Sequence, residues 1–510
     1  MKKKYPFYII LFLFSIICVP SFAGGDGESI LFAVSTNVNA GTGNYAPFWF
    51  TANRPGFSTT SPTGAYARVS AIRPFDEGKT FAWSYGADVA AAYNYPSLFD
   101  VHQLYAEARL FCWQLSVGSK ERWAQGKNPL LSTGGMTWSG NARPIPQVRF
   151  GIEDYETVPF TSGWAHVKGF ISYGKLTDNQ YQRDFVRPST YSLYTQNALF
   201  HEKSAFLKIG NKEASPLSFE VGLEMDCMFG GELWEYSSVR EETDALLFNN
   251  PSTMKDYLKA LVPLNGGENS TIADQKNAAG NHFGSIHFAG NYQTEDWKVR
   301  AYYEHYFDGR TGMTPWNATS DMEGNQHAWI AYPWFDRLSG LEFSLPANPY
   351  VSTVVVEYNT TRDQCGSIHH TSTSVLPESI HGFALYYYNS SYPAYQHWGM
   401  TIGSPLLYSP AYNEDGVLIN AHTRIRAYHL GLAGNPHAEW KYRILGTLVR
   451  SWGSYIDPLP EPANTFSALV EGTWTPNRLQ GWDFTAALAA DKGTIIGNNT
   501  GLQLSLKKTF

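Results

Sequence analysis

The segment Phe81–Asn94, with the sequence FAWSYGADVAAAYN, alternates between two kinds of side chain along its whole length. The even positions, from Ala82 to Asn94, carry small or polar residues. The odd positions carry mostly large apolar residues, namely Phe81, Trp83, Tyr85, Ala87, Val89, Ala91 and Tyr93. Because successive side chains of a β-strand point to opposite faces, this period of two predicts a strand with one apolar and one polar face.

The same alternation returns farther along the chain, in residues 297–308 and 439–451. In residues 297–308 the charged side chains fall on one face only, and in both segments aromatic residues gather at the ends of the apolar face. Aromatic rings favour the level where hydrocarbon meets water, so this placement is typical of strands that cross a membrane. A soluble β-sandwich also alternates, and the pattern alone leaves both folds open.

The last segment of the sequence favours the membrane barrel. In Gly501–Phe510, GLQLSLKKTF, one face carries Leu502, Leu504, Leu506 and Phe510. A final strand that ends on an aromatic residue resembles the terminal strand of bacterial outer-membrane barrels. We therefore expect outer-membrane lipid around the barrel and the barrel assembly machinery among its partners.

Eighteen such strands can be placed along the sequence. They lie near residues 30–41, 64–74, 81–94, 101–110, 111–119, 145–152, 163–174, 199–212, 217–231, 281–292, 296–308, 336–345, 351–361, 418–432, 438–452, 464–474, 482–491 and 500–510. If neighbouring strands alternate in direction, short connections fall at one end, and the long ones, such as 232–280 and 362–417, fall at the other. The sequence thus predicts an all-β fold, a transmembrane antiparallel barrel of about 18 strands with long extracellular loops and short periplasmic turns.

The composition agrees with this fold class. Charged residues form 16% of the 510 residues and aromatic residues 15%, whereas soluble domains carry about 25% charged residues. Beyond the N-terminus no apolar run reaches about 18 residues, which excludes a helical membrane protein. The net charge of −7, without a basic cluster outside the first four residues, excludes nucleic acid as a partner.

The N-terminus has the three parts of a secretory signal peptide. Lys2–Lys4 are basic, Phe7–Val19 is apolar, and Ser21–Ala23 forms a small-x-small cleavage site. We expect residues 1–23 to be removed, leaving residues 24–510 as one barrel domain in the outer membrane of a Gram-negative bacterium. The alternative is a lipoprotein anchor at Cys18, but Ile17 stands where such a site needs a small residue.

Several motifs resemble the Wzi-type capsule assembly proteins, in the version found in Bacteroidetes. They are Leu130–Ile152 (LLSTGGMTWSGNARPIPQVRFGI), Gly174–Phe185 (GKLTDNQYQRDF), Tyr386–Leu407 (YYYNSSYPAYQHWGMTIGSPLL), Arg450–Tyr455 (RSWGSY) and the C-terminal GNNTGLQLSLKKTF. The resemblance covers most of the chain after residue 23. It implies an eighteen-stranded outer-membrane barrel that acts as a non-enzymatic surface lectin for capsular or exopolysaccharide. Tyr386–Asn389 stands where relatives often carry an acidic pair before the tyrosines, which leaves the identity of the glycan open.

The predicted long loops supply the residue types that polysaccharide recognition uses, which are flat rings for sugar C–H faces and polar groups for hydroxyls. Three loops, 362–417, 309–335 and 120–144, carry them. The candidate residues are Asp363, Gln364, Tyr386, Tyr387, Tyr388, Asn389, Tyr395, His397, Trp398, Trp316, Trp329, Trp334 and Arg143. The alternatives are that the rings pack the loops upon themselves or join the outer girdle, and that the arginine pairs with acidic residues inside the barrel.

A short amphipathic helix is predicted over Pro251–Val262, after a Ser252 cap, and it either plugs the lumen or packs against the loops. Catalytic motifs such as GxSxG and HExxH do not occur in the sequence. His369 and His370 lack a third ligand with defined spacing, so we expect no metal and no cofactor. Two other functions remain open, a passive porin or polysaccharide export channel, and a barrel hydrolase.

Overall fold

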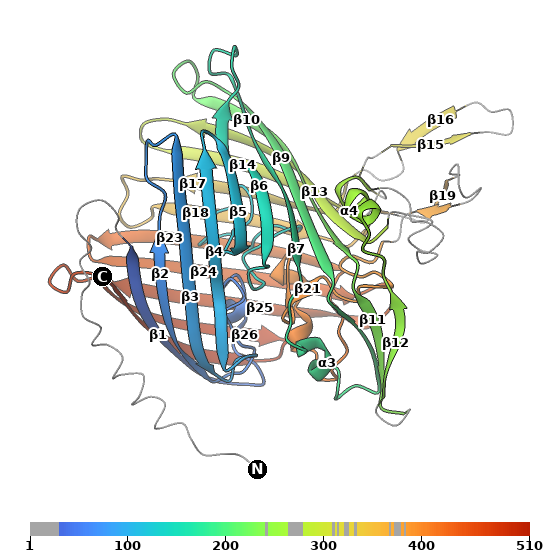
Figure 1. The fold of residues 1–510 in the computed structure, drawn as a ribbon. Coiled ribbons are helices and arrows are strands. Elements are labelled where there is room, and N and C mark those ends of the chain that lie inside the picture. The colour runs from blue at the N-terminus through green and yellow to red at the C-terminus, as the bar shows by residue number, and fades with distance from the viewer. Residues whose placement is uncertain are drawn as a thin grey trace.

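The computed structural model describes residues 30–239, 243–263, 279–308, 312–313, 316–320, 326–330, 334–366, 369–371, 379–381 and 384–510. The predicted signal peptide, residues 1–23, lies outside the described residues. The molecule is a barrel of antiparallel strands, with short connections at one end and long connections at the other (Figure 1).

Eighteen strands form one sheet that closes on itself. Closure joins the first strand to the last, with Val38 of β1 opposite Leu504 of β27. The strands of the wall are β1 (Leu31–Thr42), β2 (Gly64–Arg73), β3 (Phe81–Tyr93), β4 (Phe99–Leu110), β5 (Trp113–Ser119), β6 (Gln147–Thr157), β7 (Ala165–Lys175), β9 (Leu199–Ile209), β10 (Leu217–Phe229), β13 (Asn281–Gln293), β14 (Lys298–Asp308), β17 (Arg337–Ser344), β18 (Thr353–Thr360), β23 (Ile425–His437), β24 (Trp440–Gly453), β25 (Pro458–Trp474), β26 (Trp482–Gly493) and β27 (Asn499–Thr509).

All eighteen predicted strands are present, so the predicted fold is confirmed. Four predicted boundaries are wrong by five residues or more, namely the starts of β23 and β25 and the ends of β6 and β23. β23 begins at Ile425 instead of 418, because residues 418–424 belong to a loop that folds into the barrel. β25 begins at Pro458 instead of 464, so this strand extends beyond the alternating pattern at its start.

The wall has an apolar outer surface with aromatic rings near one end. Outward-facing Leu502 and Leu504 of β27 are 43% and 52% exposed, as expected for side chains that meet lipid. Trp113 stacks on Phe150 across β5 and β6, with ring centroids 5.2 Å apart, and Trp440 stacks on Trp474 at 6.0 Å. These pairs agree with the predicted aromatic girdle.

The two ends of the barrel differ in their connections. At the end that we call the short-turn end, the connections run from two residues, 111–112, to eight, 345–352. The other end, the long-loop end, carries all the long connections, which are 43–63, 120–146, 176–198, 230–280, 309–336 and 361–424. The long loops contain the remaining elements: α2 (Phe48–Thr51), α3 (Tyr181–Phe185), β8 (Tyr191–Gln196), β11 (Glu232–Ser237), β12 (Thr243–Asn249), α4 (Met254–Leu261), β15 (Trp316–Ser320), β16 (Gln326–Ile330), β19 (His369–Thr371), β20 (Ser379–His381), β21 (Gln396–His397), β22 (Met400–Thr401), η1 (Pro405–Leu407) and η2 (Pro410–Tyr412).

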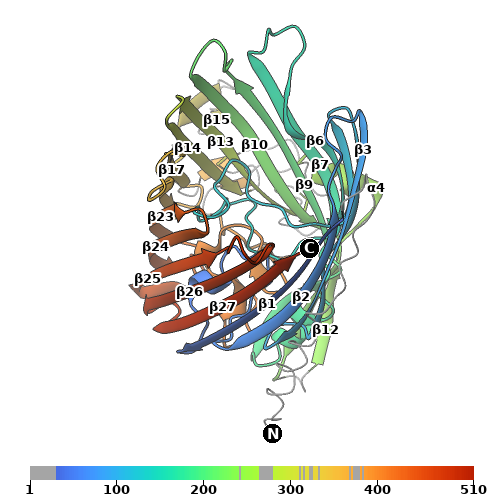
Figure 2. The same ribbon diagram turned by 90° about the vertical axis from the view of Figure 1, so that its left-hand side faces the viewer.

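Three of the long loops, 43–63, 120–146 and 361–424, fold inward and fill the barrel toward the long-loop end, inside the ring of strands (Figure 2). The loop 120–146 is tied to the inner wall, since the Ser132 hydroxyl donates to Glu357 at 2.5 Å and the Met136 N–H donates to Glu304 at 2.9 Å. The loop 361–424 packs beside it. Their shared core contains buried residues from both loops and from the wall, among them Leu131, Met136, Trp138, Phe200, Phe283, Tyr306, Tyr386, Tyr387, Tyr392, Tyr395, Ile402, Leu406, Leu407 and Tyr408.

The lumen toward the short-turn end is lined by charges instead. Inward-facing arginines pair with acidic side chains of nearby strands, as Arg300 of β14 does with Glu220 of β10 at 2.8 Å and Arg443 of β24 with Glu471 of β25 at 2.7 Å. A cavity of about 1070 Å³ lies beside the first pair and opens among the short turns. The interior therefore changes from charged and hollow to apolar and filled along its length.

The predicted helix exists as α4, but it lies outside the barrel and does not plug the lumen. The alternation of β10 points Glu220 inward, and it therefore points Phe229 outward, where its ring meets Tyr257 of α4 with centroids 5.1 Å apart. The helix is capped by Thr253, not Ser252, through a capping box with Asp256. No helix within the described residues is long and apolar enough to span a membrane.

Candidate functional site

Four side chains from three long loops meet at the long-loop end. Arg143 comes from the loop after β5, Tyr181 and Phe185 come from α3 in the loop after β7, and Trp398 comes from the loop after β18. We call this group the platform. It unites residues that are far apart in the sequence, because each loop folds back over the mouth of the barrel.

Trp398 is held in a tight turn with an unfavourable backbone. β21 pairs with β22 so that His397 faces Met400, which leaves Trp398 and Gly399 as a two-residue turn. Both have positive φ, 56° and 76°, as a type I′ turn requires. Asn-Gly suits this turn, whereas a tryptophan in the left-handed region costs roughly 1–2 kcal/mol. The surrounding structure therefore holds the indole in place against a local preference, and part of the ring remains exposed.

The guanidinium of Arg143 lies against the Trp398 ring, with Cζ 4.1 Å from the ring centroid. Its Nη1 donates to Asp100 Oδ1 at 3.1 Å. Nε and Nη2 are buried and find no hydrogen-bond acceptor within the described part of the chain. Burial lowers the pKa of Arg143, and the charge of Asp100 opposes that effect. The cation is thus held by one carboxylate and by the face of the indole.

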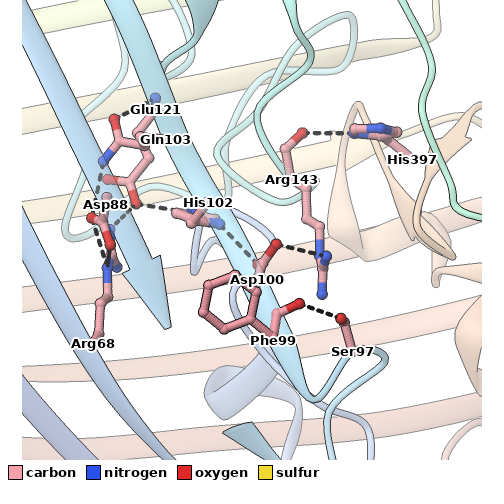
Figure 3. Close-up of polar contacts among 10 residues, drawn as sticks. All are labelled: Arg68, Asp88, Ser97, Phe99, Asp100, His102, Gln103, Glu121, Arg143 and His397. Atoms are coloured by element: carbon pink, nitrogen blue, oxygen red, sulfur yellow. Dashed lines mark hydrogen bonds and ion pairs between the residues drawn. The ribbon is translucent and has the colours of Figure 1, made fainter. Parts of the chain in front are cut away.

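A chain of charged groups continues from Asp100 into the barrel (Figure 3). His102 lies between Asp100 and Glu121, 3.5 Å and 2.9 Å from their carboxylates, and Arg68 reaches Glu121 at 2.7 Å. Burial by itself raises the pKa of Glu121, but a hydrogen bond from His102 and the charge of Arg68 outweigh burial and lower the pKa to about 2. The chain of alternating charges fixes Asp100, and Asp100 in turn fixes Arg143.

His397 links the loops beneath the platform. Its Nδ1 lies 3.0 Å from the carbonyl oxygen of Arg143, and its Nε2 lies 2.7 Å from that of Thr177 (Figure 3 shows the first contact). Burial lowers the pKa of His397 to about 4, although both carbonyl oxygens act to raise it. A neutral imidazole has one N–H and can donate to only one of these two carbonyl oxygens, but the ring contacts all three loops that carry the platform.

The aromatic part of the platform extends onto α3. The ring of Tyr181 is 5.9 Å from that of Trp398 and 5.8 Å from that of Phe185, and all three rings are partly exposed. Gly399 makes this contact possible, since a Cβ there would stand 2.3 Å from the Tyr181 hydroxyl oxygen. The arrangement offers flat apolar surfaces bordered by polar groups, which suits the two kinds of face of a sugar ring.

Five of the predicted binding residues lie inside the protein and contact its own groups. Tyr386, Tyr387, Tyr395, Gln364 and His397 are at most 2% exposed. The Tyr386 hydroxyl donates to Asp336 at 2.8 Å, and the Tyr387 hydroxyl accepts the N–H of Ser404 at 2.9 Å. The Tyr395 hydroxyl bonds to the Thr137 carbonyl oxygen, at 2.9 Å, and to Asp226. These side chains hold the inward loops together in this structure and present no ring face at the surface.

Asp363, Tyr388 and Asn389 are partly exposed in the same loop. Trp334 lies on the outer wall, where its ring stacks on His305 with centroids 4.7 Å apart, so it is separate from the platform. The backbones of Trp316 and Trp329 lie in the hairpin of β15 and β16, and their side chains lie outside the described residues. The structure thus brings together Arg143, His397 and Trp398 from the predicted set.

Tyr181 and Phe185 were missed as candidates by sequence reasoning. They lie four residues apart within the motif Gly174–Phe185, and this spacing places two rings on one face of a helical turn. That signal is weak for a helix of five residues. Among the described residues, no group of three His, Cys, Asp or Glu side chains is arranged to bind a metal.

No protein-family model and no curated protein matches the chain. Among solved structures the chain is similar to Wzi of Escherichia coli, a carbohydrate-binding β-barrel of the outer membrane involved in group 1 capsule assembly, with a TM-score of 0.54 and 13% identity, covering 94% of this chain and 84% of that chain. It also aligns with a BenF-like porin from Pseudomonas fluorescens Pf-5, at TM-score 0.47 and 8% identity over 95% of this chain and 99% of the porin. OpdK of Pseudomonas aeruginosa aligns at TM-score 0.46 and 8% identity, with the same coverage of 95% and 99%. The likeness to Wzi shows the fold, which is that of an outer-membrane β-barrel.

Proposed function

We propose that this protein is an outer-membrane lectin that binds capsular or exopolysaccharide and holds it at the cell surface without chemical change. In this proposal the long-loop end faces outward, as in other barrels with short periplasmic turns. The platform formed by Arg143, Tyr181, Phe185 and Trp398 contacts the polymer. Asp363, Tyr388 and Asn389 are further candidate contacts, because they remain partly exposed.

The observation that carries the proposal is the way Trp398 is held. The indole is kept in a costly backbone conformation, braced by a buried guanidinium, and still exposes part of its surface. Strained residues that the surrounding structure over-determines are concentrated at functional sites. An exposed ring with a fixed orientation loses little freedom when a sugar stacks on it, which favours binding.

The filled lumen supports a binding role over a passive channel. The core around Met136, Tyr387 and Tyr395 occupies the interior toward the long-loop end, where an open porin would hold water. The buried tyrosines that we expected to contact glycan have a different part in this proposal. They position the loops that carry the platform.

The proposal is tested by measuring binding of the purified barrel to polysaccharide isolated from the same cells. Trp398→Ala and Tyr181→Ala each remove a stacking surface, and each should weaken binding by about 1–2 kcal/mol, or roughly 5-fold to 30-fold. Trp398→Asn is the sharper variant, because Asn-Gly is the favoured type I′ turn and the hairpin should stay folded without the ring.

The matched control is Phe160→Ala. Phe160 is fully exposed, at 104%, in the turn between β6 and β7 at the short-turn end. This variant loses an aromatic surface on the face that the proposal assigns to the periplasm, so its binding should equal that of the wild type. Wild-type affinity in both Trp398→Asn and Tyr181→Ala would refute the assignment of the platform.

A further inference from the structure

A row of arginines crosses four neighbouring strands on the outer wall. The register places Arg337 of β17 opposite Thr360 of β18, Thr360 opposite Arg426 of β23, and Arg426 opposite Arg450 of β24. All four side chains point outward, since they share the alternation of exposed Leu430. We call Arg337, Arg426 and Arg450 the arginine row.

The row marks the upper edge of the apolar wall. Two residues nearer the short-turn end, the register aligns Tyr358, Tyr428, Leu448 and Phe466, and the last three are 53%, 45% and 49% exposed. Two residues farther toward the short-turn end, Val356 lies opposite Leu430, and they are 49% and 51% exposed. Arginines directly above such a band lie where headgroups meet acyl chains.

The charges of the row are not balanced by acidic side chains of the described residues. Arg426 and Arg450 face each other directly, and like charges in that position destabilise a strand pair. Among the described residues no acidic side chain forms an ion pair with any arginine of the row, and Arg426 Nε is buried without a hydrogen-bond acceptor. Inward-facing arginines behave differently, as Arg300 and Arg443 show with their carboxylate partners.

Two more arginines and two rings enlarge the row toward the long-loop end. The Cζ atoms of Arg362 and Arg450 lie 4.7 Å and 5.3 Å from the centroid of Trp452. The Cζ atom of Arg424 lies 4.2 Å from that of Tyr455. Trp452 and Tyr455 belong to the motif RSWGSY, which the platform does not use. The rings hold the guanidinium groups and leave their N–H groups available to an anion.

We infer that the arginine row binds the phosphate groups of a glycolipid in the outer leaflet of the membrane. Guanidinium groups bind phosphate through paired hydrogen bonds, and basic clusters at a membrane surface attract anionic headgroups. A bound phosphate also removes the repulsion between Arg426 and Arg450. The inference rests on the proposed orientation, with the long-loop end outward, but not on glycan binding by the platform.

The test measures lipid retained by the detergent-purified, full-length barrel in native mass spectrometry. The probes are diphosphoryl lipid A and the same lipid after removal of its phosphates. The wild-type protein should retain the phosphorylated lipid preferentially, and Arg426→Gln/Arg450→Gln should retain it about tenfold less. Arg426→Lys/Arg450→Lys should keep part of the binding, because it keeps the charge and loses the paired geometry.

Arg478→Gln is the matched control, since Arg478 is an exposed arginine in the turn at the short-turn end between β25 and β26. Its lipid retention should equal that of the wild type. Equal retention of both lipids, or an undiminished signal in the folded Gln double variant, would overturn the inference. Displacement of lipid by millimolar inorganic phosphate would also overturn it, because the site would then be one for free phosphate.

The same variants separate this inference from the proposed function. The Gln double variant should bind purified polysaccharide as the wild type does, and Trp398→Asn should retain phosphorylated lipid normally. Loss of polysaccharide binding in Arg426→Gln/Arg450→Gln, with lipid retention intact, would make the row part of the glycan site and contradict the lipid assignment. Barrel folding in every variant is checked by heat-modifiable migration in gels.

Discussion

The indole ring of Trp398 covers the guanidinium of Arg143, whose Cζ atom lies 4.1 Å from the ring centroid. This contact joins two of the loops that fill the barrel, 120–146 and 361–424, to the surface that they expose. One end of the contact is tied to the wall through Asp100 of β4, and the other sits in the strained turn between β21 and β22. Changes in the interior should therefore affect the platform, and changes at the platform should leave the wall intact.

Replacing Arg143 tests the brace under the platform. Arg143→Gln removes the guanidinium that pairs with the mostly buried carboxylate of Asp100, and we expect a loss of about 3 kcal/mol in unfolding free energy. Denaturant unfolding of the purified barrel measures it. Arg183→Gln is the control, because the Arg183 side chain is 45% exposed in its ion pair with Asp244 and should cost less than about 1 kcal/mol. Equal losses in the two variants would contradict the brace.

The buried hydroxyl of Tyr395 should matter for stability. Tyr395→Phe removes the group that joins Thr137 to Asp226 and leaves that buried carboxylate without its donor, at a cost of roughly 1–3 kcal/mol. Limited proteolysis of the loop 361–424 reports the change. Tyr388→Phe, in the same loop, removes a partly exposed hydroxyl that forms no hydrogen bond with the described residues, and its cleavage rate should not change.

Acid should loosen the inward loops through His397. Its pKa is about 4 in the folded protein and about 6.5 in an unfolded chain, so the unfolded state binds more protons between these values. The contribution of His397 to the free energy of unfolding is therefore fully present above pH 6.5. It falls as the pH drops toward 4, by roughly 3 kcal/mol at pH 4. Proteolysis of the loop 361–424 at pH 7 and pH 4.5 measures this loss. His397→Gln should remove most of the pH dependence, and an unchanged pH profile in that variant would exclude His397 as its source.

The filled lumen predicts low ion conductance. Wild-type protein in planar bilayers should show no large steady current, because the core of the inward loops occupies the interior. A variant lacking residues 384–408, with its barrel fold verified, should conduct. Wild-type currents as large as those of the deletion variant would support the passive channel instead.

The wall could be predicted from the sequence, and the interior could not. Strands such as Phe81–Tyr93 can be predicted from the alternation of side chains within the segment itself, without knowledge of the neighbouring strands. The loops 120–146 and 361–424 have no period. From the sequence, their aromatic residues fitted both glycan contact and packing of the loops upon themselves. The enclosed apolar space that favours packing is revealed only by the assembled wall.

The platform was predicted only in part, because the packing of its loops is not visible in the sequence. Arg143, His397 and Trp398 stood among the candidates because of their residue type. Their proximity depends on three loops folding over one mouth, and Tyr181 and Phe185 join them only through that packing. The outward placement of Arg426 and Arg450 and their direct opposition needed the strand register.

The most direct test of the central claim is the fraction of polysaccharide that stays attached to cells when the native gene is replaced by the Trp398→Asn form. The lectin assignment predicts that polymer is shed into the medium while total polymer stays normal, and that a Phe160→Ala strain retains its polymer. Full attachment in the Trp398→Asn strain, with the protein present at wild-type levels in the outer membrane, would contradict it.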